Sequence, residues 1–177
     1  MKTKQLAIDA MLAAMCAVLG YLSVDFGNLK VTFESVPVLV AALMFGAVDG
    51  LAVGGIGTLI YQLLHYGISI TTPLWIMPHA LAGLLVGLYI QRRGFRLTRA
   101  QAMLLIIFSE LFITVLNTGV MYVDSKIFGY YSYAYIFGAL ALRFALCAAR
   151  ATVYAVILPK LVDAVSERLR GGNAHDR

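Results

Sequence analysis

The stretch YAYIFGALALRFALCAARATVYAVILP, residues 133–159, decides the fold class of this chain. It is long enough to cross a bilayer, which takes about 20 apolar residues in a helix. Two arginines, Arg143 and Arg150, interrupt the apolar run seven residues apart. An arginine at the centre of a membrane helix costs roughly 2.5–3.5 kcal/mol on insertion scales. We therefore expect both to face a polar cavity or a partner, on one face of the helix and about two turns apart.

The whole chain has the composition of an integral membrane protein. Of its 177 residues, 61% are hydrophobic and 13% are charged, whereas soluble domains have about 25% charged residues. This length allows one membrane domain of about six spans, each of roughly 20 residues, and leaves no room for a soluble catalytic domain. The net charge of +5 is interpreted as a signal for topology and for contact with the lipid bilayer, and no nucleic acid partner is expected.

The apolar segments predict an all-α integral membrane protein with six transmembrane helices. The expected spans are residues 5–23, 36–48, 51–66, 73–91, 100–123 and 133–159. The dipeptide Asp49–Gly50 is interpreted as a tight turn between the second and third spans. The connector VDFGNLKVTFES (residues 24–35) is compatible with an extended segment or a hairpin. Residues 1–170 are expected to form a single domain, and residues 171–177 a disordered cytoplasmic tail.

Lysine and arginine are distributed unevenly between the two sides of the predicted bundle. With six spans both termini share a side. That side collects Lys2, Lys4, Arg92, Arg93, Arg96, Arg99, Lys160, Arg168, Arg170 and Arg177. The opposite side has only Lys30 and Lys126. Because basic residues favour the cytoplasmic side, the count predicts that both termini and the arginine-rich loop are cytoplasmic.

Depth along the predicted helices pairs the charged residues of the last two spans. Glu110 lies about ten residues and Arg150 about nine residues from the inner ends of their spans, at about 1.5 Å of rise per residue. In adjacent antiparallel helices these depths coincide. We therefore predict a structural ion pair between Glu110 and Arg150, since a single buried charge is less stable than a pair.

A second polar layer is predicted in the outer half of the membrane. It combines Arg143 with Asn117, His79 and Gln62, and His65 lies in the same outward turns as Gln62. The layer opens toward an aromatic rim of Tyr66, Trp75, Tyr122, Tyr130, Tyr131 and Tyr135. Aromatic walls with one fixed guanidinium suit a flat heteroaromatic ligand that carries a carboxylate or phosphate.

Each member of this layer also has a simpler explanation. Tyrosine and tryptophan at the membrane edge often form an interfacial belt. His79 alone fits a hydrogen-bonded core residue, and Asn117 alone fits a contact between helices. It is their coincidence with Arg143 at one depth that favours a ligand site.

The sequence has no motif of an enzyme active site. It lacks HExxH, GxSxG and a P-loop, so no catalytic residues are assigned and an enzyme is not expected. The histidines are too dispersed to predict a metal site, although His65 and His79 could converge, and no cofactor is expected. GxxxG-like spacings at Gly46/Gly50/Gly54 and at Gly83/Gly87 are typical of packed membrane helices and do not predict a function.

Four features of the chain resemble the substrate-binding S components of energy-coupling factor (ECF) vitamin transporters. They are an alanine-striped first span, the run KVTFESVPVLVAALMFGAVDGLAVGGIGTLIYQLL (30–64), the span PLWIMPHALAGLLVGLY (73–89), and a fifth span with LNT (116–118) before a last span that begins FGAL (137–140). The second run looks most like the folate-type branch. The resemblance implies a multi-pass protein of a prokaryotic cell membrane that binds a vitamin-like small molecule at its outer side.

The resemblance also implies roles for particular residues and partners. Uptake would need a membrane-embedded coupling subunit and two cytoplasmic ATPases. The stripe implied to contact the coupling subunit is Ala10, Ala13, Ala14 and Ala17. The implied pocket lies among the outer halves of the last three helices and the outer loops, where His79, Asn117 and Arg143 fall. Residues 29–34, which end at Glu34, and residues 65–72 are implied to gate it.

Two functions follow as the main hypotheses, and a third, a membrane enzyme that uses Glu110 or His79, is disfavoured because the sequence has no cluster of acid–base residues. The first is capture of folate or a similar vitamin, with Arg143, His79, Lys30 or Lys126 serving its carboxylates. The second is a membrane scaffold or assembly subunit that takes no part in transport and docks partners through small-residue helix faces. Binding of a vitamin that survives detergent extraction separates the two.

Overall fold

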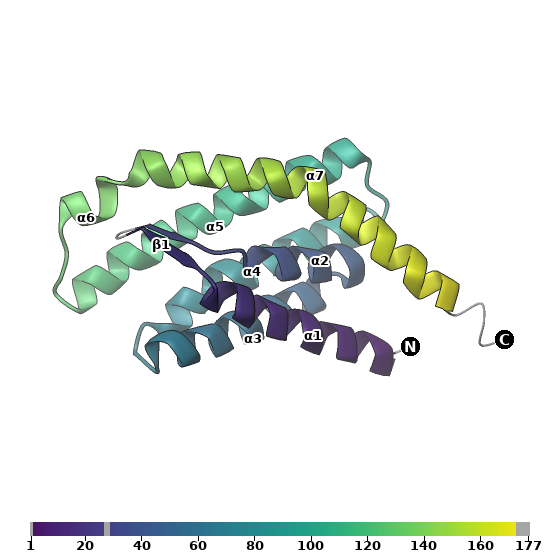
Figure 1. Ribbon diagram of the computed structural model, residues 1–177, viewed down its shortest axis with the longest axis horizontal. Coiled ribbons are helices and arrows are strands. Elements are labelled where there is room, and N and C mark those ends of the chain that lie inside the picture. Colours follow the sequence, from purple (N-terminus) through teal and green to yellow (C-terminus); the bar gives the residue numbers. More distant parts are fainter. Residues whose placement is uncertain (1, 27–28, 173–177) are drawn as a thin grey trace.

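The computed structural model describes residues 2–26 and 29–172. They form seven helices and a short two-stranded hairpin. The elements in chain order are α1 (Lys2–Tyr21), β1 (Val24–Phe26), β2 (Leu29–Val31), α2 (Ser35–Phe45), α3 (Ala47–Tyr66), α4 (Thr72–Arg92), α5 (Arg99–Ile127), α6 (Tyr133–Phe137) and α7 (Leu140–Gly172). The long helices lie side by side in one elongated bundle (Figure 1), so the predicted helical membrane fold is confirmed.

Among the described residues, five helices are long and apolar enough to cross a membrane. They are Thr3–Tyr21, Ala47–Tyr66, Thr72–Arg92, Arg99–Ile127 and the segment Tyr133–Glu167. The second predicted span, α2, is apolar but has 11 residues. It is therefore about 16 Å long, half the thickness of the hydrocarbon core. Most of α2 is buried against its neighbours, which explains why it is apolar on all sides.

The tight turn between α2 and α3 is at Gly46 and not at Asp49–Gly50. Gly46 has a φ of 106°, a conformation that glycine adopts without strain. Asp49 lies in the first turn of α3, where the helix dipole favours an acidic residue. Gly50 lies within the helix, and a Cβ there would be 2.6 Å from the carbonyl oxygen of Gly83 in α4. The glycine thus serves close helix packing rather than a turn.

The last predicted span is divided and longer than expected. Helix α6 ends at Phe137, α7 begins at Leu140, and α7 continues through Pro159 to Gly172. Residues 171–172, assigned to a disordered tail from the sequence, are helical, and the rest of that predicted tail lies outside the described residues. The later, yellow part of α7 turns away from the bundle (Figure 1).

The connector between α1 and α2 contains a hairpin, which is one of the two forms predicted for it. Strands β1 and β2 are antiparallel, with Val24 opposite Val31. The chain then returns over the bundle to α2, and Arg150 Nη1 of α7 donates a 2.8 Å hydrogen bond to the carbonyl oxygen of Thr32. The connector is thereby attached to the last long helix.

The core lies where α2, α4, α5 and α7 meet. Its largest cluster is Leu39, Val40, Ala42, Leu43, Val86, Ile90, Ile106, Tyr154 and Leu158. The described ends of the chain and the arginine-rich α4–α5 connection lie at one end of the bundle (Figure 1). This arrangement agrees with both termini sharing a side, while their assignment to the cytoplasm stays a prediction from charge.

Candidate substrate-binding site

A cavity of about 690 Å³ lies at the end of the bundle opposite the arginine-rich connection. This volume falls in the range of sites for small molecules, about 300–1,000 Å³. The lining residues are Thr32, Glu34, Tyr61, Gln62, His65, Tyr66, Ser69, Thr71, Trp75, His79, Thr114, Asn117, Thr118, Met121, Asp124, Phe128, Tyr130, Tyr135, Arg143 and Arg150. They come from the connector, from α3, α4, α5, α6 and α7, and from the loops beside them.

Most of the sequence-predicted ligand residues meet in this cavity. Those that line it are Glu34, Gln62, His65, Tyr66, Trp75, His79, Asn117 and Arg143. Tyr122 and Tyr131 do not: their rings pack edge to face, 5.6 Å apart, and Lys126 Nζ lies 3.8 Å from the Tyr131 ring centroid. For Tyr122 the reason is helical phase, because Met121 lies on the cavity face of α5 and its neighbour Tyr122 points about 100° away.

One end of the cavity is a buried carboxylate–imidazole pair. Glu34 Oε1 lies 3.3 Å from His79 Nε2, and the two residues are only 5% and 3% exposed. The hydroxyl of Thr32 donates to Glu34 Oε1 at 3.3 Å. Within the described residues, Glu34 Oε2 and His79 Nδ1 are buried and make no hydrogen bond. Leaving such a group unsatisfied costs about 1–3 kcal/mol, so this end is prepared to accept polar groups of a ligand or water.

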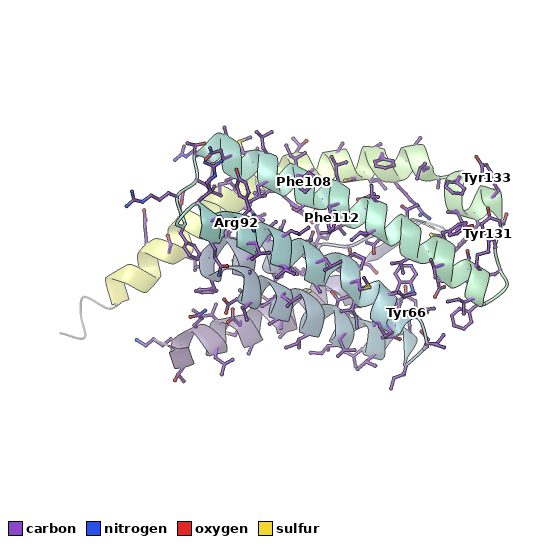
Figure 2. All side chains as sticks on the ribbon, turned by 180° about the vertical axis from the view of Figure 1, so that it is seen from behind. Tyr66, Arg92, Phe108, Phe112, Tyr131 and Tyr133 are labelled. Atoms are coloured by element: carbon purple, nitrogen blue, oxygen red, sulfur yellow. The ribbon has the colours of Figure 1, made fainter. Side chains whose placement is uncertain are left out.

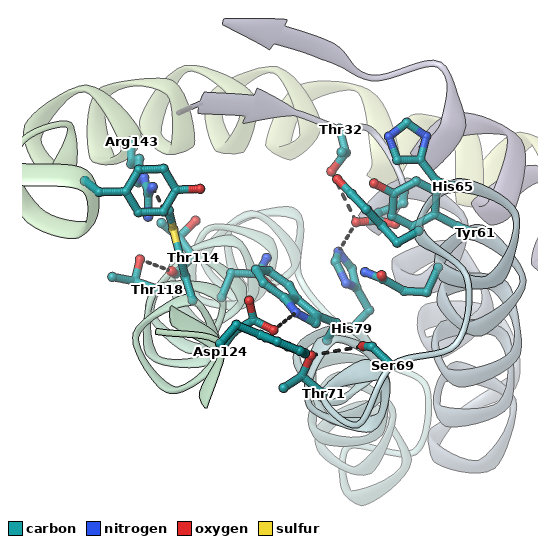
Figure 3. A pocket seen from close by; sticks show the side chains of 18 of the residues that line it. Thr32, Tyr61, His65, Ser69, Thr71, His79, Thr114, Thr118, Asp124 and Arg143 are labelled. Atoms are coloured by element: carbon teal, nitrogen blue, oxygen red, sulfur yellow. Dashed lines mark hydrogen bonds and ion pairs between the residues drawn. The ribbon is translucent and has the colours of Figure 1, made fainter. Parts of the chain in front are cut away.

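The other end is formed by Arg143 of α7. Its Nη2 donates to the Met121 sulfur at 2.9 Å, and the side chain is half-buried. Figure 3 shows Arg143 across the cavity from His79, Tyr61 and His65. A guanidinium in this position can pair with a carboxylate or phosphate on a bound ligand.

Arg150, which lines the cavity, forms an ion pair with Glu110, which does not. Arg150 Nη2 is 3.3 Å from Glu110 Oε2, and the Glu110 side chain is fully buried. This is the pairing expected from their depths. Through its bond to Thr32, Arg150 also connects the buried pair to the segment that carries Glu34.

Sequence reasoning missed Asp124, which is 7% exposed and organises the mouth of the cavity. Its carboxylate accepts from Trp75 Nε1 at 3.2 Å and from the hydroxyl of Tyr130. Burial, followed by the bond to Asp124, raises the pKa of Tyr130 above its ordinary value. Tyr130 therefore remains a protonated donor throughout the neutral range.

The α5 face could have been found by spacing alone. Thr114, Met121 and Asp124 lie three, four and seven residues from Asn117, and Thr118 lies four residues after Thr114; these are the spacings of one helical face. The hydroxyls of Thr114 and Thr118 donate to the carbonyl oxygens four residues earlier, so the threonines add shape and acceptor lone pairs rather than charge.

The loop between α3 and α4 closes one side of the cavity. Ser69 N donates to Thr72 Oγ1 at 2.9 Å, and Ser69 Oγ is hydrogen-bonded to Thr71 Oγ1 at 3.1 Å. Beside it His65 packs edge to face on Tyr66, with ring centroids 4.4 Å apart. The segment predicted as a gate is thus internally ordered while it lines the site.

Of the four alanines in the α1 stripe, two are buried and two are exposed. Ala13 and Ala17 are each 6% exposed, and a Cβ on Gly57 of α3 would lie 2.9 Å from the Ala13 carbonyl oxygen. Ala10 and Ala14 are exposed. The prediction that Ala13 and Ala17 contact a partner is therefore wrong: both face the bundle, because residues four apart lie on the same face of a helix. Only Ala10 and Ala14 remain accessible.

The described residues contain no group of three or more His, Cys, Asp or Glu side chains that could hold a metal ion.

Comparison with known proteins places this arrangement in a family. The family model for the substrate-specific component of ECF transporters matches residues 4–165. The chain belongs to this family. A search of curated proteins found no match.

Two solved structures share the fold. One is the crystal structure of FolT bound with folic acid, which has a TM-score of 0.66 and 18% sequence identity over 88% of this chain and 91% of that chain. The other is the S component of a bacterial ECF transporter, with a TM-score of 0.67 and 21% identity over 93% of this chain and 99% of that one. At these identities the two structures establish the fold of this chain. They do not identify its ligand, which depends on the residues of the site.

Membership fixes the general role of the chain. S components are multi-pass proteins of the prokaryotic plasma membrane, and the apolar helices of this chain agree with that location. The chain is the substrate-binding subunit of a transporter that works with an ECF module, and the family is one of transport components rather than enzymes.

Proposed function

We propose that this S component captures a vitamin with a flat, nitrogen-rich ring and an anionic group, and that folate or a close analogue is the best candidate. The observation that carries the proposal is the cavity with the Glu34–His79 pair at one end and Arg143 at the other. A carboxylate accepts N–H groups of a heterocycle, and a guanidinium pairs with a carboxylate. One ligand bearing both kinds of group satisfies both ends.

The walls of the cavity support a planar ligand. Trp75, Tyr61, Tyr66 and Tyr135 are among the residues that line the cavity. Aromatic side chains supply large apolar contact area and stack on rings in offset or edge-to-face geometry. Folic acid has a pterin ring with N–H groups and a glutamate with two carboxylates, and FolT, a protein of the same fold, binds it.

We further propose that the substrate enters from the outer side, and that the exposed face of α1 docks a membrane-embedded coupling subunit driven by two cytoplasmic ATPases. The charge distribution supports this orientation, since the cavity lies at the end away from the arginine-rich connection. Ala10 and Ala14 are exposed beside Met11 and Val18, which are 67% and 54% exposed. Small residues on such a face let another helix approach closely.

The first experiment is native mass spectrometry of the protein purified in mild detergent from rich medium. A co-purified vitamin is the expected result, and its mass identifies the substrate. The matched samples are Glu34→Gln and Arg143→Ala, which should lose the bound mass, and Arg93→Ala, which removes a cation at the opposite end and should retain it. An empty wild-type protein whose melting temperature responds to no member of a vitamin panel would contradict the proposal and favour the scaffold hypothesis.

A further inference from the structure

A second cavity, of about 630 Å³, lies between α4 and α5 on the outside of the bundle. It shares no lining residue with the substrate cavity. The residues that line it are Ala82, Leu85, Val86, Leu88, Tyr89, Arg92, Gln101, Leu104, Leu105, Phe108, Ser109 and Phe112. We call it the α4–α5 groove.

The body of the groove is apolar. Leu85, Leu104 and Phe108 are 43%, 67% and 60% exposed, and the rings of Phe108 and Phe112 stack with centroids 6.3 Å apart. The hydroxyl of Ser109 donates to the carbonyl oxygen of Ile106 at 2.8 Å, so its hydrogen-bond donor is already satisfied within α5. A flexible hydrocarbon chain matches this lining.

The polar residues of the groove stand at one end. Arg92 is the last residue of α4 and Gln101 lies in the first turn of α5. Figure 2 shows Arg92 near one end of the bundle, and Phe108 and Phe112 lie farther from that end. The adjoining connection adds Arg93 and Arg96, and the sequence has no acidic residue between Asp49 and Glu110. Within the described part of the chain, no ion pair involves Arg92, so the groove ends in uncompensated positive charge.

The length of the groove matches one leaflet of a bilayer. From Gln101 to Phe112 the helix rises about 16 Å, and half of the hydrocarbon core is about 15 Å. A ligand whose anionic group meets Arg92 at the membrane surface would therefore lay a hydrocarbon chain along Leu104, Phe108 and Phe112 to the middle of the membrane.

We propose that the α4–α5 groove binds an anionic phospholipid of the leaflet on the arginine-rich side, with its phosphate at Arg92 and one acyl chain in the groove. The charge at one end, the apolar body and the leaflet-long extent each match a different part of that molecule.

The test is native mass spectrometry of the detergent-purified full chain, titrated with phosphatidylglycerol or with phosphatidylcholine of the same acyl chains. We expect phosphatidylglycerol adducts to predominate. Arg92→Gln should weaken them about fivefold, because a basic residue near the membrane surface contributes about 1 kcal/mol toward an anionic lipid. Leu104 is an exposed residue of the groove, and the larger side chain in Leu104→Trp should fill part of it. This variant should therefore weaken the binding of both lipids. Lys160→Gln removes a cation outside the groove and should leave the adducts unchanged.

Three outcomes would overturn the proposal. Equal adducts of the two lipids would mean that binding ignores the headgroup charge. Unchanged phosphatidylglycerol binding in both Arg92→Gln and Leu104→Trp would place the lipid elsewhere. A dimer that Leu104→Trp dissociates would assign the groove to a second copy of the chain. Melting temperatures of the variants without lipid, equal to that of the wild type, separate a lost site from a lost fold.

Discussion

Arg150 and Glu110 form an ion pair between α7 and α5, with Nη2 and Oε2 3.3 Å apart, and the same guanidinium donates to the carbonyl oxygen of Thr32. One side chain thus joins two long helices and the connector that leads to Glu34. The Glu110 side chain is fully buried, whereas that of Arg150 is 18% exposed. Loss of the arginine therefore leaves a charge with no access to water.

Arg150→Met is expected to destabilise the folded protein by about 3–5 kcal/mol, the usual effect of removing one partner of a buried pair. The double variant Glu110→Leu/Arg150→Met should recover most of that loss, because two apolar side chains replace the pair. Thermal unfolding in detergent measures both. A double variant no more stable than Arg150→Met would show that the hydrogen bond to Thr32, rather than the ion pair, carries the effect.

Arg143→Ala is expected to weaken vitamin binding by about 2–5 kcal/mol, at least thirtyfold in Kd, because the anionic group of the ligand would lose its partner inside the cavity. Isothermal titration with the identified vitamin measures the loss. Arg93→Ala, at the other end of the bundle, serves as the control of equal charge. Wild-type affinity in a folded Arg143→Ala protein would remove Arg143 from the site.

Trp75 should report ligand binding by fluorescence. It is the single tryptophan of the chain, lines the cavity and donates to Asp124. A stacked ring ligand is expected to quench its emission, with a titration midpoint equal to the calorimetric Kd. Asp124→Ala should change the emission of the ligand-free protein, since the indole loses its acceptor. Emission that stays constant while calorimetry records binding would place the ligand away from Trp75.

The two exposed alanines of α1 can be separated from the buried ones by matched substitutions. Ala14→Leu is expected to leave vitamin binding intact and to abolish uptake in cells that contain the coupling module, because the added bulk keeps another helix away. Ala13→Leu should instead lower the melting temperature, since overpacking a tight interface costs about 1–3 kcal/mol. Ala145→Leu, exposed on α7, is the control for added bulk. Normal uptake with Ala14→Leu would exclude this face as the docking surface.

Much of the fold could be predicted because the length of an apolar segment and the positions of its charged residues are read directly from the sequence. The spans, the hairpin-compatible connector and the depth match of Glu110 with Arg150 all rest on counting along the chain. Arg143, Asn117, His79 and Gln62 were likewise brought together by depth, since charged and amide groups in a membrane need a common polar space.

The errors came from features that depend on direction around a helix or on neighbouring helices. Tyr122 has the same depth as the cavity but the wrong phase, and Asp124 was overlooked although it shares a face with Asn117. Ala13 and Ala14 look alike in the sequence, yet one packs on α3 and the other is exposed. The turn was predicted at Asp49–Gly50, and not at Gly46, because Asp–Gly is the stronger turn signal in a sequence. The requirement for Gly50 within the helix is seen only from the packing of α3 on α4.

The close approach of α3 and α4 gives a test of packing that needs no ligand. A Cβ on Gly83 would lie 2.2 Å from the Gly50 carbonyl oxygen, whereas a Cβ on Gly119 of α5 would meet nothing within 4 Å. Gly83→Ala should therefore destabilise the protein by about 1–3 kcal/mol as the backbones are forced apart. Gly119→Ala should stabilise it by about 0.4–1 kcal/mol, because alanine lowers the entropy of the unfolded chain. Equal melting temperatures for the two variants would contradict this packing of α3 on α4, and with it the position of His79, whose carbonyl oxygen lies 2.6 Å from a Cβ on Gly54.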